Sequence, residues 1–100
     1  MGRVKIDIHQ ERLTEFCKKN HILKLALFGS VLRDDFRPDS DIDVLVEFAH
    51  GFVPGLAFFE MEQELSEILG RKVELHTPQF LSPYFRDHVL KEAEIQYVAA

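Results

Sequence analysis

Cysteine and long apolar runs are both scarce in this sequence. Its 100 residues include one cysteine, Cys17, which excludes an internal disulfide and a cysteine-rich zinc module. The apolar runs are far shorter than the roughly 18 residues that a membrane span requires. The first residues alternate charged and aliphatic side chains, unlike a secretory signal peptide. We therefore expect a cytoplasmic protein with no membrane partner.

Basic side chains are also in short supply. Lys and Arg total 12 against 17 Asp and Glu, which gives a formal net charge of −5. Broad binding to nucleic acid requires many cationic side chains, so we expect no direct nucleic-acid partner. A length of 100 residues, with 46% apolar and 29% charged side chains, is typical of one globular domain. We expect residues 1–100 to form that single domain.

The spacing of apolar residues predicts alternating helices and strands. Helices are expected over 9–20, 56–69 and 82–93, strands over 22–28, 41–48 and 72–76, and a loop over 34–40. Gly70 predicts a helix end, and Ser82 followed by Pro83 predicts a helix start. This order is typical of an α/β or α+β fold in which helices cover a small sheet. It leaves the strand directions open.

The strongest chemical signal is the pair Asp41 and Asp43 at the start of an expected strand. Residues two apart on a strand project to the same face, and neighbouring carboxylates repel each other unless a cation lies between them. Mg²⁺ is the natural partner of such oxygen ligands. The alternative is a solvated acidic face, but the strand is otherwise strongly hydrophobic, which favours a partly buried location.

Gly29 and Ser30 follow the preceding strand and form a second, weaker signal. A strand-to-helix junction with these residues can present backbone N–H groups and a hydroxyl to an anion; a simple turn is the alternative. The sequence contains neither a Walker-type loop nor a Gly-x-Gly-x-x-Gly motif. A nucleotide would therefore have to be held mainly through a metal ion.

Together these signals read Gly-Ser, a spacer, then Asp-x-Asp, which resembles the signature of the nucleotidyltransferase superfamily that includes DNA polymerase β. The segments 27–33 (LFGSVLR) and 38–46 (PDSDIDVLV) resemble its minimal nucleotidyltransferase branch. Members of this branch are small prokaryotic proteins, commonly encoded beside HEPN-type ribonuclease toxins and acting as their antitoxins. The resemblance covers nearly the whole chain and implies a small mixed sheet with the polymerase β-like nucleotidyltransferase fold.

The resemblance also implies a metal site for ATP. Asp41 and Asp43 would bind Mg²⁺ that bridges the triphosphate. Glu74 would be the third carboxylate and metal ligand, supporting a second ion or accepting the proton of the attacking hydroxyl. Many members of the superfamily have Asp where this chain has Glu74, and both side chains supply oxygen ligands.

Phosphate contacts are implied for three further residues. Gly29 and Ser30 would hold the β- and γ-phosphates, and Arg33 would neutralise phosphate charge. His76 shares a strand face with Glu74, and we interpret it as a structural or exposed residue, although it could lie near the site.

Aromatic residues around the second expected helix have two interpretations. Phe58 and Phe59 are expected in the core and not on a base-stacking platform. Phe52, Val53 and Leu56 could form an exposed patch for a partner or anchor the loop to the core.

The leading hypothesis is a Mg²⁺-dependent protein adenylyltransferase that acts as an antitoxin. It would transfer AMP from ATP to a tyrosine of a HEPN ribonuclease toxin and release pyrophosphate. The chain is too short for the second domain with which larger relatives hold their substrates, so we expect the toxin to complete the cleft in a hetero-oligomer. Two alternatives are transfer to a small cationic molecule such as an aminoglycoside, and a non-catalytic antitoxin that acts by occlusion.

Overall fold

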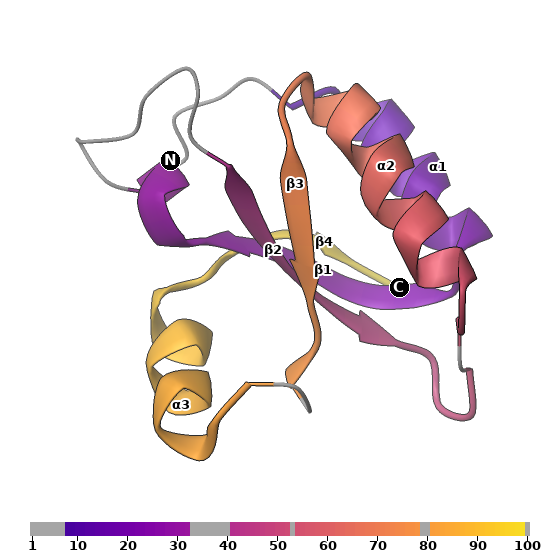
Figure 1. The fold of residues 1–100 in the computed structure, drawn as a ribbon. Coiled ribbons are helices and arrows are strands. Elements are labelled where there is room, and N and C mark those ends of the chain that lie inside the picture. Colours follow the sequence, from indigo (N-terminus) through magenta and orange to yellow (C-terminus); the bar gives the residue numbers. More distant parts are fainter. Residues whose placement is uncertain (1–7, 33–40, 53, 79–80, 100) are drawn as a thin grey trace.

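The computed structural model describes residues 8–32, 41–52, 54–78 and 81–99, except for the side chain of Ser30 (Figure 1). Its strands are β1 (Ile22–Phe28), β2 (Ile42–Phe48), β3 (Val73–His76) and β4 (Glu94–Val98). Its helices are α1 (Gln10–Lys19), α2 (Ala57–Leu69) and α3 (Pro83–Glu92), and a 3₁₀ helix, η1 (Gly29–Leu32), directly follows β1.

The four strands form one mixed sheet in the order β3-β2-β1-β4. β1 pairs antiparallel with both β2 and β4, whereas β2 and β3 are parallel. The connection between the parallel strands passes through α2, as parallel pairing requires a crossover. Helices α1 and α2 cover one face of the sheet and α3 lies on the other (Figure 1). This arrangement confirms the predicted α+β fold.

Alternating strand residues supply two apolar clusters on opposite faces of the sheet. The main core, between the sheet and the helices α1 and α2, includes Leu13, Phe16, Cys17, Leu25, Leu27, Ile42, Val44, Val46, Leu65 and Val73. The smaller cluster, beneath α3, consists of Phe28, Leu45, Leu81 and Val89. Among the described residues, the apolar cluster on the second face is the one beneath α3, and acidic side chains can occupy other positions on that face.

Two predicted helix boundaries are confirmed by their capping geometry. Gly70 follows α2 with a φ of 72°, and its N–H donates to the Ser66 carbonyl. Ser82 precedes α3, and its hydroxyl oxygen accepts a hydrogen bond from the Phe85 N–H. Within the described ranges, every helix is too short or too polar to cross a membrane.

Strand β4 was not predicted from the sequence. Its side chains are half-buried or exposed, and Ile95 and Val98 are among the exposed large apolar residues. Neither face of such an edge strand is fully buried. The alternation of apolar and polar residues that identifies half-buried strands is therefore weak in its sequence. Pairing with β1 defines it instead.

Candidate active site

The pairing register brings two of the predicted acidic residues together. Asp43, the second residue of β2, lies opposite Glu74 on the parallel strand β3 and opposite Phe28 on β1. Partners on neighbouring strands project to the same face of a sheet. Glu74 therefore stands beside Asp43, while Val73 and Leu75 point into the main core on the other face. The predicted alternation of β3 is confirmed.

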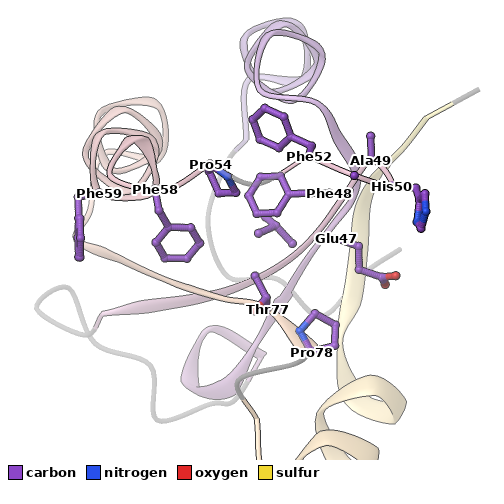
Figure 2. A pocket seen from close by; sticks show the side chains of 13 residues that line it. Glu47, Phe48, Ala49, His50, Phe52, Pro54, Phe58, Phe59, Thr77 and Pro78 are labelled. Atoms are coloured by element: carbon purple, nitrogen blue, oxygen red, sulfur yellow. The ribbon is translucent and has the colours of Figure 1, made fainter.

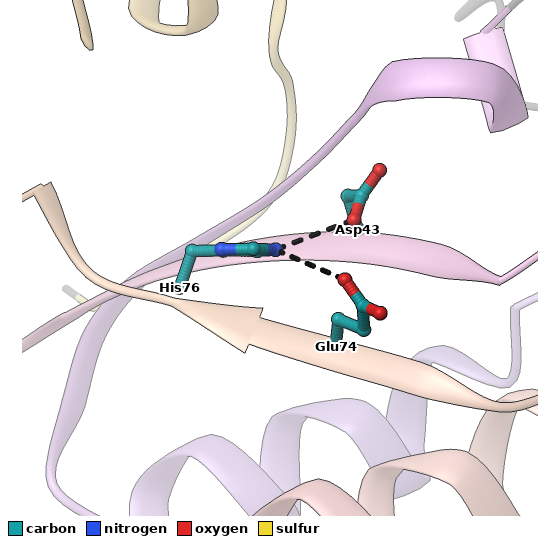
Figure 3. A group of neighbouring side chains, drawn as sticks. All are labelled: Asp43, Glu74 and His76. Carbon is teal, nitrogen blue, oxygen red and sulfur yellow. Dashed lines mark hydrogen bonds and ion pairs between the residues drawn. The ribbon is translucent and has the colours of Figure 1, made fainter. Parts of the chain in front are cut away.

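His76 completes a group of three potential metal ligands (Figure 3). Its Nε2 lies 3.3 Å from Asp43 Oδ1 and 3.8 Å from Glu74 Oε2. One ligand atom from each of the three residues lies within 4.8 Å of the other two. The side chains of His76, Asp43 and Glu74 are 28%, 29% and 49% exposed. The group is thus partly sheltered and still open to a ligand from solvent.

The acidic neighbours change the protonation of His76. A hydrogen bond to Asp43 raises the pKa of the imidazole above its ordinary value, and the negative charges of Asp43, Glu74 and Glu62 act in the same direction. Partial burial opposes this shift without reversing it. The acidic surroundings therefore favour the protonated ring, whose positive charge balances part of the charge of the carboxylates.

Gly29 places the end of β1 against the same acidic group. Its φ is 81°, a left-handed conformation that favours glycine. A Cβ at this position would lie 2.5 Å from Asp43 Oδ2, so the site has no room for a side chain there. The backbone of Gly29 consequently packs directly beside one carboxylate oxygen, at the point where η1 begins.

Hydrogen bonds from helix α2 fix the position of β3 relative to β2 beside this site. β3 lies at the edge of the sheet, and α2 occupies the amide donors on its outer side. The Val73 N–H donates to Ser66 Oγ at 3.0 Å, and the Leu75 N–H donates to Glu62 Oε2 at 2.9 Å. Because these two amides flank Glu74, the contacts from α2 hold Glu74 in register with Asp43.

The other predicted site residues are Asp41, Ser30 and Arg33, and of these only Asp41 has a described side chain. Asp41 is half-buried and precedes β2, and it does not belong to the group of potential ligands formed by Asp43, Glu74 and His76. The side chain of Ser30 and the whole of Arg33 lie outside the described residues. Of the predicted site residues, the structure therefore brings together Gly29, Asp43 and Glu74.

His76 is the residue that sequence reasoning undervalued. Its place on the same strand face as Glu74 was visible in the sequence, but its distance from Asp43 depends on the parallel pairing of β2 and β3. In that pairing Leu45 lies opposite His76. The backbone of His76 is therefore two residues further along its strand than the position at which Asp43 and Glu74 face each other. The ring points back toward them (Figure 3).

A second concave feature lies beyond the other end of β2 (Figure 2). This pocket of about 730 Å³ is lined by residues from the end of β2, the following loop, the start of α2 and Thr77 and Pro78. Its apolar wall contains an aromatic row in which the Phe48 ring lies 5.4 Å from Phe52 and 6.5 Å from Phe58. It carries none of the three potential metal ligands.

The burial of the aromatic residues around this pocket shows which of them belong to the core and which are exposed. Phe58 packs against the main core, as predicted, and Phe52 does so too. Phe59 and Leu56 are exposed, so the prediction of a core position for Phe59 was wrong. Val53 lies outside the described residues.

A mixed sheet with an acidic residue on each of two neighbouring strands, next to a glycine at a strand-to-helix junction, suits metal-dependent transfer of phosphorus-containing groups. The nucleotidyltransferase domain family matches residues 10–95. The chain therefore belongs to the nucleotidyltransferase family, and it is a nucleotidyltransferase.

Known proteins extend this similarity. The protein adenylyltransferase MntA of Thermococcus cleftensis is 33% identical over 85 residues, which are 84% of this chain and 81% of that protein. A solved structure assigned as a minimal nucleotidyltransferase is 33% identical, with a TM-score of 0.71 over 85% of this chain and 86% of that chain. The predicted resemblance to minimal nucleotidyltransferases is thereby confirmed.

The fold also matches a structure of a tri-AMPylated Shewanella oneidensis HEPN toxin in complex with an MNT antitoxin. The TM-score is 0.65, with 22% identity, over 90% of this chain and 70% of the matched chain. At this identity the likeness concerns the fold alone.

Proposed function

We propose that this protein is a Mg²⁺-dependent protein adenylyltransferase that silences a HEPN ribonuclease toxin. It transfers AMP from ATP to a tyrosine hydroxyl of the toxin. The observation that carries the proposal is the register of β2 and β3, which sets Asp43 beside Glu74. The adenylyltransferase named among the relatives and the AMPylated toxin in the structurally similar complex support the choice of reaction and partner.

The donor set fits a divalent ion. Asp43 and Glu74 offer carboxylate oxygens on one face, and Gly29 lacks the side chain that would collide with the Asp43 carboxylate. Asp41, two residues before Asp43, would join them when an ion is bound. Two Mg²⁺ ions held by these carboxylates would stabilise the charge on the attacking and leaving oxygens.

The proposed transfer forms one bond to phosphorus and breaks another. The tyrosine oxygen forms a bond to the α-phosphorus of ATP, the bond from that phosphorus to the α,β-bridging oxygen breaks, and pyrophosphate leaves. The hydroxyl proton has to be taken up as the new bond forms. Glu74 is the best-placed acceptor in this proposal, because it is the more exposed of the two neighbouring carboxylates. The backbone of Gly29 and Ser30, with Arg33, would position the β- and γ-phosphates.

Intact-mass measurement tests the proposal. The chain is mixed with Mg²⁺, ATP and the HEPN protein of the neighbouring gene, and the native protein should add AMP to the toxin. Asp43→Asn and Glu74→Gln should lower the rate by at least about a hundredfold, since each removes a charge that positions the reacting groups. Glu47→Gln is the matched control, because Glu47 lies on the same strand as Asp43 but pairs with Lys24 at 3.6 Å.

The same variants separate catalysis from occlusion. Toxin neutralisation that persists in Asp43→Asn and Glu74→Gln, without AMP addition by the native chain, would contradict the proposal and favour a purely binding antitoxin. Addition of AMP to an aminoglycoside and not to the toxin would identify the small-molecule alternative.

A further inference from the structure

We propose that His76 is a nitrogen ligand of the cation site, so that this site prefers a first-row transition metal ion such as Mn²⁺ or Co²⁺ over Mg²⁺. The inference rests on the proposed function only for the location of the site, which it shares. The expected ligands were carboxylates alone, and the structure adds an imidazole to them.

The distances allow one ion to contact all three side chains. Bonds from such ions to nitrogen or carboxylate oxygen are about 2.0–2.2 Å long, so two donors on one ion lie at most about 4.4 Å apart. His76 Nε2 lies within this limit of both Asp43 Oδ1 and Glu74 Oε2, at 3.3 and 3.8 Å. The ligand atoms of Asp43 and Glu74 lie within 4.8 Å of each other, and a small rotation of the more exposed Glu74 side chain would place this pair within the same limit.

The orientation of the His76 ring has a cause besides its attraction to Asp43. The ring meets the buried Phe28 edge to face, with 5.3 Å between centroids and 62° between planes. Phe28 lies opposite Asp43 on β1, so this contact draws the imidazole toward the acidic end of the face. Nε2 then points at the two carboxylates (Figure 3). A residue that served only to neutralise charge would not need this support.

The chemistry of the donors decides the metal. Mg²⁺ prefers six oxygen ligands in near-ideal octahedral geometry and keeps several waters. Imidazole nitrogen raises the affinity for transition metals, which follow the order Mn²⁺ < Fe²⁺ < Co²⁺. A site with two carboxylates and one imidazole therefore gains affinity for Co²⁺ and Mn²⁺ from His76 and gains little for Mg²⁺.

Metal binding to the isolated chain tests this inference without ATP or toxin. Calorimetric titration should give tighter binding of Co²⁺ than of Mg²⁺. His76→Gln should weaken Co²⁺ binding by at least the roughly tenfold to hundredfold that loss of an outer-shell partner costs, and should leave Mg²⁺ binding nearly unchanged. Electron spin-echo spectra of the Mn²⁺ complex should contain nitrogen modulation in the native chain and lose it in the variant.

His88→Gln is the matched control. His88 also faces a carboxylate, with 2.8 Å between its Nε2 and Glu92 Oε2, but it lies on α3. This variant should keep both the metal preference and the nitrogen modulation. The inference is overturned if the native complex lacks nitrogen modulation, if it shows no preference for Co²⁺, or if His76→Gln weakens both metals equally. Because the titrations contain no nucleotide or toxin, failure of AMP transfer leaves their result intact.

Discussion

At the scale of single residues, glycine at position 29 serves two purposes at once. Its left-handed backbone turns the chain from β1 into η1, and the missing side chain leaves room for the Asp43 carboxylate. Gly70 shares the first property, with a φ of 72°, but a Cβ there would meet nothing within 4 Å. Substitutions at these two glycines therefore distinguish the effect of backbone strain, which both share, from the effect of crowding, which only Gly29 has.

This comparison gives a prediction. Gly70→Ala should lower the free energy of unfolding by about 1–2 kcal/mol, the cost of a left-handed non-glycine residue, and Gly29→Ala should lower it further because its methyl group also collides with Asp43. Only Gly29→Ala should also weaken divalent-metal binding, because its methyl group displaces the Asp43 carboxylate. Chemical denaturation and calorimetric metal titration measure the two effects. Equal metal binding by both variants would contradict the role given to Gly29.

His76 gives a second prediction at this scale, for the metal-free chain. Its pKa is raised on folding, first by the hydrogen bond to Asp43. Folding then favours the protonated ring, so this stabilisation is complete below the ordinary pKa of about 6.5. It is lost as the pH rises through the higher folded-state pKa.

Melting temperatures in a chelator measure this effect. The melting temperature of the native chain should exceed that of His76→Gln by the largest margin near pH 6 and by a smaller margin near pH 8. Asp43→Asn should bring the pKa of His76, followed by nuclear magnetic resonance, back toward its ordinary value. A margin that grows with pH would show that the sign is wrong.

At the scale of elements, the sequence was most informative where periodicity is strong. The alternation of Ile42, Val44 and Val46 predicted the buried face of β2, and the cap residues Gly70 and Ser82 predicted helix ends that the structure confirms. These signals are local, since each follows from the geometry of one strand or one helix terminus.

Features that depend on pairing could not be predicted in this way. β4 exists because it pairs with β1, and its exposed side chains give no inward pattern. The proximity of His76 to Asp43 likewise follows from the parallel register of β2 and β3. The family resemblance supplied Asp43 and Glu74 as partners, but it did not supply the imidazole between them.

At the scale of the whole molecule, the main core shields the one cysteine. Cys17 is fully buried between α1 and the sheet, and burial raises its pKa to about 12. The thiol is thus both neutral and inaccessible near pH 8, and it can react only when the main core opens.

We therefore expect Cys17 to report global unfolding. Ellman's reagent should leave the native chain essentially unmodified over minutes at pH 8, and should label one thiol per chain in denaturant. The labelling rate should rise with denaturant in parallel with loss of helical circular dichroism. Rapid stoichiometric labelling of the native chain would contradict the burial of Cys17.

The contacts from α2 to β3 have a consequence for how a substrate can approach. An exposed sheet edge normally offers its amides to an incoming strand, but the Val73 and Leu75 amides are occupied by Ser66 and Glu62. The protein substrate proposed above would therefore be unable to dock strand-on-strand through these amides beside Glu74. In the proposed reaction the acceptor side chain would instead approach the sheet face that carries Asp43 and Glu74, so recognition would depend on one protruding side chain and not on an extended segment of backbone.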